Sequence, residues 1–95
     1  MTDPVILILA SLAIGDKHGY AMMEDIENFA GVRLGPGTLY GAITRMEERG
    51  LIRPVESTDR RQPYCITALG RRQLGHAVQH LGRVVSTASE RLKHA

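Results

Sequence analysis

Gly35-Pro36-Gly37-Thr38-Leu39-Tyr40-Gly41-Ala42-Ile43-Thr44-Arg45-Met46-Glu47-Glu48-Arg49-Gly50 has the pattern of one helix with two different faces. A proline in the first helical turn favours a start at Pro36, and Gly50 is a typical stop signal. At 3.6 residues per turn, one face carries apolar side chains that we assign to the core. These are Leu39, Ala42, Ile43 and Met46. The other face and its flanks carry small, hydroxyl, tyrosine and basic residues and one carboxylate: Gly37, Thr38, Tyr40, Gly41, Thr44, Arg45 and Glu48. Such a face lets a helix lie close to base edges, where threonine and arginine are competent readers. Glu48 is expected to face solvent, because a carboxylate repels phosphates.

Two helices are expected before this one. Thr2-Asp3-Pro4 places capping side chains before a proline, so a first helix begins there and extends to about Ile14. It is apolar almost all round, which predicts burial on two sides. A second helix follows from about His18 to Ala30, and Gly31 ends it. Its inner face is predicted from helical spacing: Tyr20, Met23, Ile26 (or Glu27) and Ala30.

After Gly50 the pattern changes. Leu51–Ser57 and Gln62–Ile66 are short β-type segments around Thr58-Asp59-Arg60-Arg61, which predicts a hairpin with an arginine tip. Pro54 confines its strand to an edge or a bulge. The fold class that we expect is mainly α with a small β-hairpin. This is a winged helix-turn-helix over residues 1–66, followed by a C-terminal dimerisation helix that Thr67 caps, over residues 67–95.

Apolar residues in the last helix step by four and three, which is typical of a helix–helix seam. We expect this seam to form a dimer interface: Leu74, Val78, Leu81, Val85, Ala88 and Leu92. The positions beside the seam are mostly small or apolar, so the helix should pack on more than one neighbour. The first helix is one candidate, and a second copy of the chain is another.

The net charge of +2 is unevenly distributed. Residues 1–30 hold one lysine and five carboxylates, whereas residues 31–73 hold eight arginines and four carboxylates. This distribution indicates an anionic partner near the middle of the chain. Arginine is the side chain best suited to forked contacts with phosphate and guanine.

The composition excludes several classes of protein. Apolar residues at 43% and charged residues at 23% are ordinary for a globular domain. The single cysteine, Cys65, cannot form an internal disulfide, which favours a reducing compartment. The apolar run 5–12 is far shorter than the ~20 residues of a membrane span and lacks the basic flank of a signal peptide. We therefore expect a cytoplasmic protein with no membrane partner.

No motif for an enzyme or a cofactor site is found. His76 and His80 stand one helical turn apart, but no carboxylate or thiol near them completes a metal site. Cys65 alternates with Tyr64 and Ile66, so it should point outward if those two point inward. Phosphate loops, nucleophile elbows and paired carboxylates are lacking, so we expect no enzyme activity, no cofactor and no metal.

Three separated strings carry a family resemblance. They are His18-Gly19-Tyr20, the string from Leu34 to Ile52 that contains Pro36-Gly37-Thr38-Leu39-Tyr40, and Arg60-Arg61 followed by Tyr64-Cys65-Ile66-Thr67 and Gly70. Together they resemble the PadR family of bacterial transcriptional regulators over residues 5 to about 72. The resemblance implies a homodimeric winged helix-turn-helix repressor on a palindromic operator, often released by a small effector. The chain departs from the family pattern at Gly35, commonly serine, and at Gly41, often proline.

The resemblance also implies roles for single residues. Tyr40 is similar to a tyrosine that lies against the DNA backbone, with Thr38 beside it, and Arg60 and Arg61 are similar to a basic wing. From position and charge we add Lys17 and Tyr20 as phosphate contacts, and Gly41, Thr44 and Arg45 on the outward helix face.

A second function remains open at this point. A winged-helix module that binds another protein would need exposed apolar residues on the third helix. The residues found there are glycine, threonine and arginine, so we favour double-stranded DNA as the partner.

Overall fold

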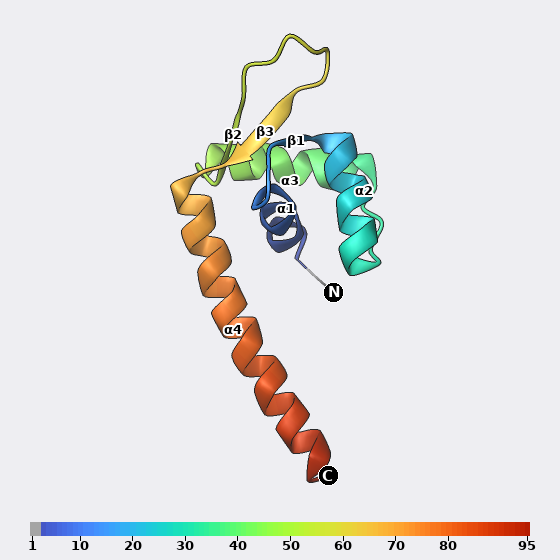
Figure 1. Ribbon diagram of the computed structural model, residues 1–95, viewed down its shortest axis with the longest axis vertical. Helices are drawn as coiled ribbons and strands as arrows, with labels where there is room; N and C mark the ends of the chain where they lie inside the picture. Colours follow the sequence, from blue (N-terminus) through green and yellow to red (C-terminus); the bar gives the residue numbers. More distant parts are fainter. Residues whose placement is uncertain (1–2) are drawn as a thin grey trace.

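The computed structural model describes residues 3–95, and their order of elements confirms a mainly helical fold with a small sheet (Figure 1). The elements are α1 (Pro4–Leu12), β1 (Lys17–His18), α2 (Gly19–Ala30), α3 (Pro36–Glu48), β2 (Ile52–Pro54), β3 (Pro63–Ile66) and α4 (Ala68–Lys93). α1 lies at the centre of the globular part, with α2 and α3 packed on it and the sheet at one end. α4 starts beside the sheet and projects away from it.

The predicted start and stop signals act through specific hydrogen bonds. The Asp3 carboxylate accepts a hydrogen bond from the Val5 amide at 2.9 Å, which caps α1, while Thr2 lies outside the described residues. Gly31 ends α2 with φ 66°, and Gly50 follows α3 with φ 75°, a region that favours glycine. α1 ends at Leu12, earlier than the sequence predicts, and Ile14 is exposed.

One core joins the three helices to the sheet. Its buried side chains come from α1, α2, α3 and β2 and from the residues just before α3 and β2: Leu7, Ile8, Leu9, Leu12, Met22, Ile26, Leu34, Leu39, Ala42, Ile43, Met46, Leu51 and Ile52. The four residues predicted for the inner face of the third helix are all among them. α1 contacts α2, α3, α4 and β3, which confirms the predicted burial of this helix on more than one side.

The inner face of α2 confirms the prediction for Ile26 and in part for Met23, and contradicts it for Tyr20 and Ala30. Met22 and Ile26 are fully buried, Met23 is half-buried, and Tyr20 and Ala30 are exposed. Two overlapping sets of residues in this helix have helical spacing, so periodicity alone does not choose between them. The set that contains Met22 places more aliphatic surface in the core and leaves the phenol of Tyr20 in water, which is the favourable arrangement.

The sheet has the order β1-β3-β2 and is antiparallel throughout. β2 is an edge strand, as Pro54 predicts. β1 was not predicted, because two residues carry no periodicity; its pairing of Lys17 with Tyr64 and His18 with Pro63 attaches the start of α2 to the hairpin. Cys65 corrects another expectation: it is buried, while Tyr64 and Ile66 are half-buried and also contact the core. β3 packs against α1, and both of its faces are covered in part.

A close contact fixes the start of α4. Thr67 caps the helix by accepting a hydrogen bond from the Gly70 amide at 3.0 Å, and its hydroxyl also lies 2.6 Å from the Gly50 carbonyl oxygen. Gly70 is buried, and a Cβ added there would collide with the carbonyl oxygen of Leu51. Beyond Leu74, which still packs against the core, α4 leaves the globular part.

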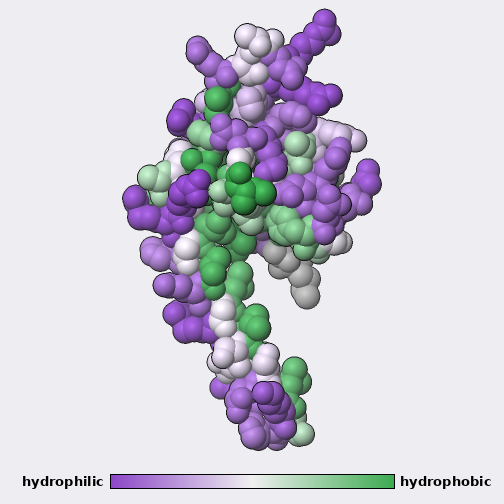
Figure 2. All heavy atoms as spheres, in the orientation of Figure 1, coloured by the Kyte–Doolittle hydropathy of each residue, from purple (hydrophilic) through white to green (hydrophobic). Residues whose placement is uncertain are grey.

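The projecting part of α4 carries an apolar stripe (Figure 2). Leu74 is half-buried against the core, whereas Val78, Leu81, Val85 and Leu92 are exposed. In residues 3–95 no helix combines the length and the apolar character needed to cross a membrane.

Candidate nucleic-acid interface

A hollow of about 440 Å³ lies between the start of α2, the middle of α3 and the loop 55–62, which we call the wing. We call this cavity the wing hollow. Seven residues line it: His18, Gly19, Tyr20, Tyr40, Arg60, Arg61 and Gln62. Four of them were predicted as DNA contacts, and the fold brings these four together from three distant segments. None of the seven carries a carboxylate, so the hollow is suited to an anion.

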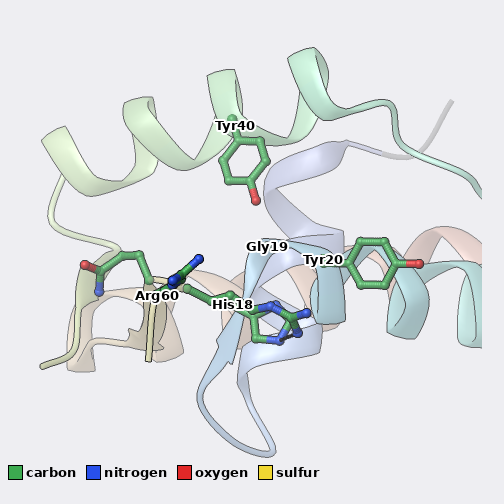
Figure 3. Close-up of a pocket in the computed structure, with 7 residues that line it drawn as sticks. His18, Gly19, Tyr20, Tyr40 and Arg60 are labelled. Carbon is green, nitrogen blue, oxygen red and sulfur yellow. Dashed lines mark hydrogen bonds between the residues drawn. The ribbon is translucent and has the colours of Figure 1, made fainter. Parts of the chain in front are cut away.

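Tyr40 reaches into the wing hollow from α3. Figure 3 shows its ring extending toward Gly19, whereas the ring of Tyr20 points away from the hollow. Gly19 makes room for this ring, because a Cβ built at Gly19 would lie only 2.6 Å from Cζ of Tyr40. Gly19 is buried, and Tyr40 keeps 47% of its surface exposed. The tyrosine is therefore both positioned by α2 and open to a ligand.

The wing is held in shape by its own side chains. The Gln62 amide donates hydrogen bonds to the carbonyl oxygens of Val55, at 2.9 Å, and Pro63, at 2.7 Å. Asp59 accepts a hydrogen bond from the Arg61 amide at 3.4 Å. These contacts leave Arg60 and Arg61 exposed on the side of the wing that faces α2.

The exposed face of α3 continues from the hollow. Thr38, Thr44 and Arg45 are exposed and Gly41 is half-exposed, as the sequence predicts. The Thr44 hydroxyl donates to the Tyr40 carbonyl oxygen at 3.0 Å. The Arg45 guanidinium lies over Gly41, with Nη1 3.5 Å from where a Cβ of that residue would be. Arg45 thus lies on the exposed face of α3, beside the small residue Gly41.

Other basic residues are directed elsewhere. The Lys17 ammonium donates to the backbone carbonyl of Ser11 at the end of α1, so the structure does not bring this predicted contact into the wing hollow. Arg33 pairs with Glu27 at 3.4 Å, and Arg71 donates to the Ala13 carbonyl at 3.4 Å. Arg60 and Arg61 are the basic residues that line the wing hollow, and Arg45 is exposed on the adjoining face of α3.

Tyr64 lies in β3, where it pairs with Lys17 of β1, the short strand just before α2. Burial raises the pKa of its phenol above the usual 10.0, and the nearby charges of Glu47 and, when ionised, Tyr40 raise it further. The phenol is therefore neutral at ordinary pH and adds no negative charge near the interface.

Sequence reasoning missed three residues of the hollow. His18 and Gly19 were assigned only to the family resemblance and the start of the second helix, and Gln62 only to the second β-type segment, without a DNA contact for any of them. The sequence indicates that His18 lies at the start of α2. The proximity of His18 to the wing depends on the pairing of β1 with β3, which was not predicted. Within residues 3–95 no group of three or more His, Cys, Asp or Glu side chains is arranged to hold a metal ion.

Comparison with known proteins decides the family. A family model described as the transcriptional regulator PadR-like family matches residues 8–76. This chain belongs to the PadR-like family. Members of the family are DNA-binding transcription regulators and not enzymes, and the predicted resemblance is confirmed.

Solved structures of PadR-like proteins share this fold. A PadR family transcription regulator from Clostridium difficile superimposes with a TM-score of 0.85 at 26% identity, covering 94% of this chain and 97% of that one. A PadR-like regulator from Bacillus cereus gives a TM-score of 0.83 at 24% identity, covering 93% and 89% of the two chains.

A curated protein is closer in sequence. An uncharacterised 37.1 kDa protein from a Streptomyces fradiae transposon is 46% identical over 90 residues, which is 90% of this chain. This PadR-like chain spans only 26% of the length of that protein.

Proposed function

We propose that this PadR-like protein is a homodimeric repressor that binds a palindromic operator in double-stranded DNA. In this proposal α3 enters the major groove, Thr38, Thr44 and Arg45 face base edges, and Tyr20, Tyr40, Arg60 and Arg61 meet the phosphate backbone. The supporting observation is that exposed small and basic residues of α3 and the carboxylate-free wing hollow form one surface. Lys17 stays a predicted phosphate contact.

The alternative partner is another protein. A protein-binding α3 would expose large apolar side chains, and of that class only Tyr40 is exposed on this helix. Its ring is directed to the wing hollow, next to arginines and a glycine. These features favour DNA over a protein surface.

We also propose a division of labour along the chain. Residues 1–66 bind DNA, and residues 67–95 join two copies through the seam Leu74, Val78, Leu81, Val85, Ala88 and Leu92. Support comes from the exposure of Leu81 and Val85, at 42% and 63%, in a helix with almost no other neighbour there. Burying such side chains contributes roughly 1.5–3 kcal/mol each. Release from DNA by a small effector is part of the proposal, and a release screen on the bound operator tests it.

The test of DNA binding uses two arginines with different expected roles. Genome-wide capture of bound DNA first supplies the operator. Arg45→Ala should then cost about 1–3 kcal/mol on the operator and relax preference at one base pair per half-site. Arg61→Ala should weaken operator and scrambled duplex alike and reduce the log–log salt slope by about one for each lost phosphate contact.

Both variants are titrated against both duplexes at several salt concentrations. Equal losses on both duplexes for Arg45→Ala would make Arg45 a phosphate contact. Two results together would refute the proposed function and favour a protein partner. The capture experiment would recover no specific DNA, and the affinity of the wild type for duplex DNA would not change with salt concentration.

A further inference from the structure

His18 occupies a cap position that defines which of its nitrogens carries hydrogen. Its Nδ1 lies 3.2 Å from the backbone amide of Ala21. A backbone N–H can only donate, so Nδ1 must be the acceptor. In the neutral imidazole the hydrogen is then on Nε2. The cap therefore leaves Nε2–H as a donor at the edge of the wing hollow.

A second donor faces the first. Nη1 of Arg61 lies 3.2 Å from Nε2 of His18. A guanidinium has no acceptor atom, so two N–H groups meet here with no acceptor between them. This arrangement is unfavourable by itself. An anionic oxygen placed beside both nitrogens would accept from both, and such charge-assisted hydrogen bonds are the strong ones.

The surroundings select the kind of anion. The hollow is open to solvent, Arg60 adds a second guanidinium, and Tyr40 extends toward it from α3. The Asp59 carboxylate is engaged by the backbone amide of Arg61. An extended polyanion that lies against α3 would therefore present an oxygen to this corner.

From this geometry we propose that Nε2 of His18 and the guanidinium of Arg61 together bind one backbone phosphate of duplex DNA. The inference rests on the proposed function. It adds His18 as a DNA contact and explains why its Nε2 lies beside Arg61. One phosphate then joins the start of α2 to the wing, two elements that β1 and β3 already hold together.

The test needs a variant that keeps the cap and removes the donor. His18→Asn does so, because asparagine is a good N-cap whose oxygen can accept from the Ala21 amide, while its side chain is too short to replace Nε2. His76→Asn, exposed on α4, is the matched control. We expect His18→Asn to keep the melting temperature and to lose about tenfold in operator affinity, as for one charge-assisted hydrogen bond. The control should bind as the wild type does.

A double-mutant cycle shows whether the two side chains share one phosphate. The variant with both His18→Asn and Arg61→Ala should lose less affinity than the product of the two single losses, because each single change already disrupts the same contact. Replacing that phosphate by an uncharged methylphosphonate should weaken the wild type and leave the double variant unaffected. Losses that multiply independently would overturn the proposal.

The proposal and the proposed function fail in different ways. If His18→Asn binds the operator as tightly as the wild type while Arg45→Ala still loses base preference, DNA binding stands and the shared phosphate is refuted. If the His18 imidazole resonance responds to inorganic phosphate but not to the operator, the corner is a free-phosphate site and the proposal is overturned.

Discussion

Replacing Gly70 by alanine is expected to lower the free energy of unfolding by about 2–4 kcal/mol. The added Cβ would meet the Leu51 carbonyl oxygen and lie 2.9 Å from Cγ1 of Ile66. A backbone oxygen cannot turn aside as the end of a side chain can. This oxygen also accepts hydrogen bonds from the amide and the hydroxyl of Thr67, at 3.1 and 3.0 Å.

The magnitude follows from these contacts. Moving the Leu51 carbonyl weakens two hydrogen bonds of about 1 kcal/mol each, and overpacking adds about 1–3 kcal/mol. Alanine returns up to about 1 kcal/mol through its higher helix propensity. Gly37→Ala, also in the first turn of a helix, is the matched control, since a Cβ there meets nothing within 4 Å. The control should be neutral or stabilised by up to about 1 kcal/mol.

Urea denaturation at one fixed protein concentration measures both variants against the wild type. Equal midpoints for Gly70→Ala and the wild type would mean that the joint between β2 and α4 relaxes at no cost. The close approach of Gly70 to the Leu51 carbonyl oxygen would then not fix the start of α4.

Three further outcomes are expected. Gly19→Ala should push the Tyr40 ring out of the wing hollow and weaken DNA binding about tenfold in fluorescence titrations with little change in melting temperature; unchanged affinity would remove Tyr40 from the interface. The pKa of Tyr64 is raised in the folded state, so the stability that its phenol contributes is intact below pH 10.0 and declines above it. Tyr64→Phe should flatten this decline in unfolding curves measured at alkaline pH, and an identical decline in the variant would contradict the expectation. Leu81→Glu should dissociate the dimer in light scattering, whereas the same charge on the opposite face, Gln79→Glu, should not; an unchanged dimer mass for both would refute the seam.

Most of the fold was predictable because local signals and burial agree. Pro36, Gly50 and Thr67 act where expected, and the core face of α3 has only one apolar choice of phase. α2 has two, which share Ile26, and the sequence favours the one that also places Tyr20 and Ala30 in the core, although both are exposed. The burial of Cys65 depends on contacts between β3 and distant elements, which alternation along one strand does not report.

The sequence predicted several of the residues of the candidate site, but not how all of them are arranged in space. Tyr40, Arg60 and Arg61 were assigned to one surface from charge and from the family resemblance. The positions of His18 and Gly19 depend on a two-residue strand, and that of Gln62 on hydrogen bonds across the wing. Such short or non-local interactions leave no periodic trace in a sequence.

The length of α4 has a consequence for the spacing of operator half-sites. Its 26 residues span about 39 Å at 1.5 Å per residue, and Gly70 and Thr67 join it firmly to the DNA-binding part. For two copies paired along this helix, sliding one seam past the other by a heptad would displace one recognition helix by about 10 Å, or roughly three base pairs. The axial register of the paired α4 helices would thus set the distance between the two recognition helices. Substitutions in α4, far from the DNA, could then change which half-site spacing the protein prefers, with every DNA-contacting residue left intact.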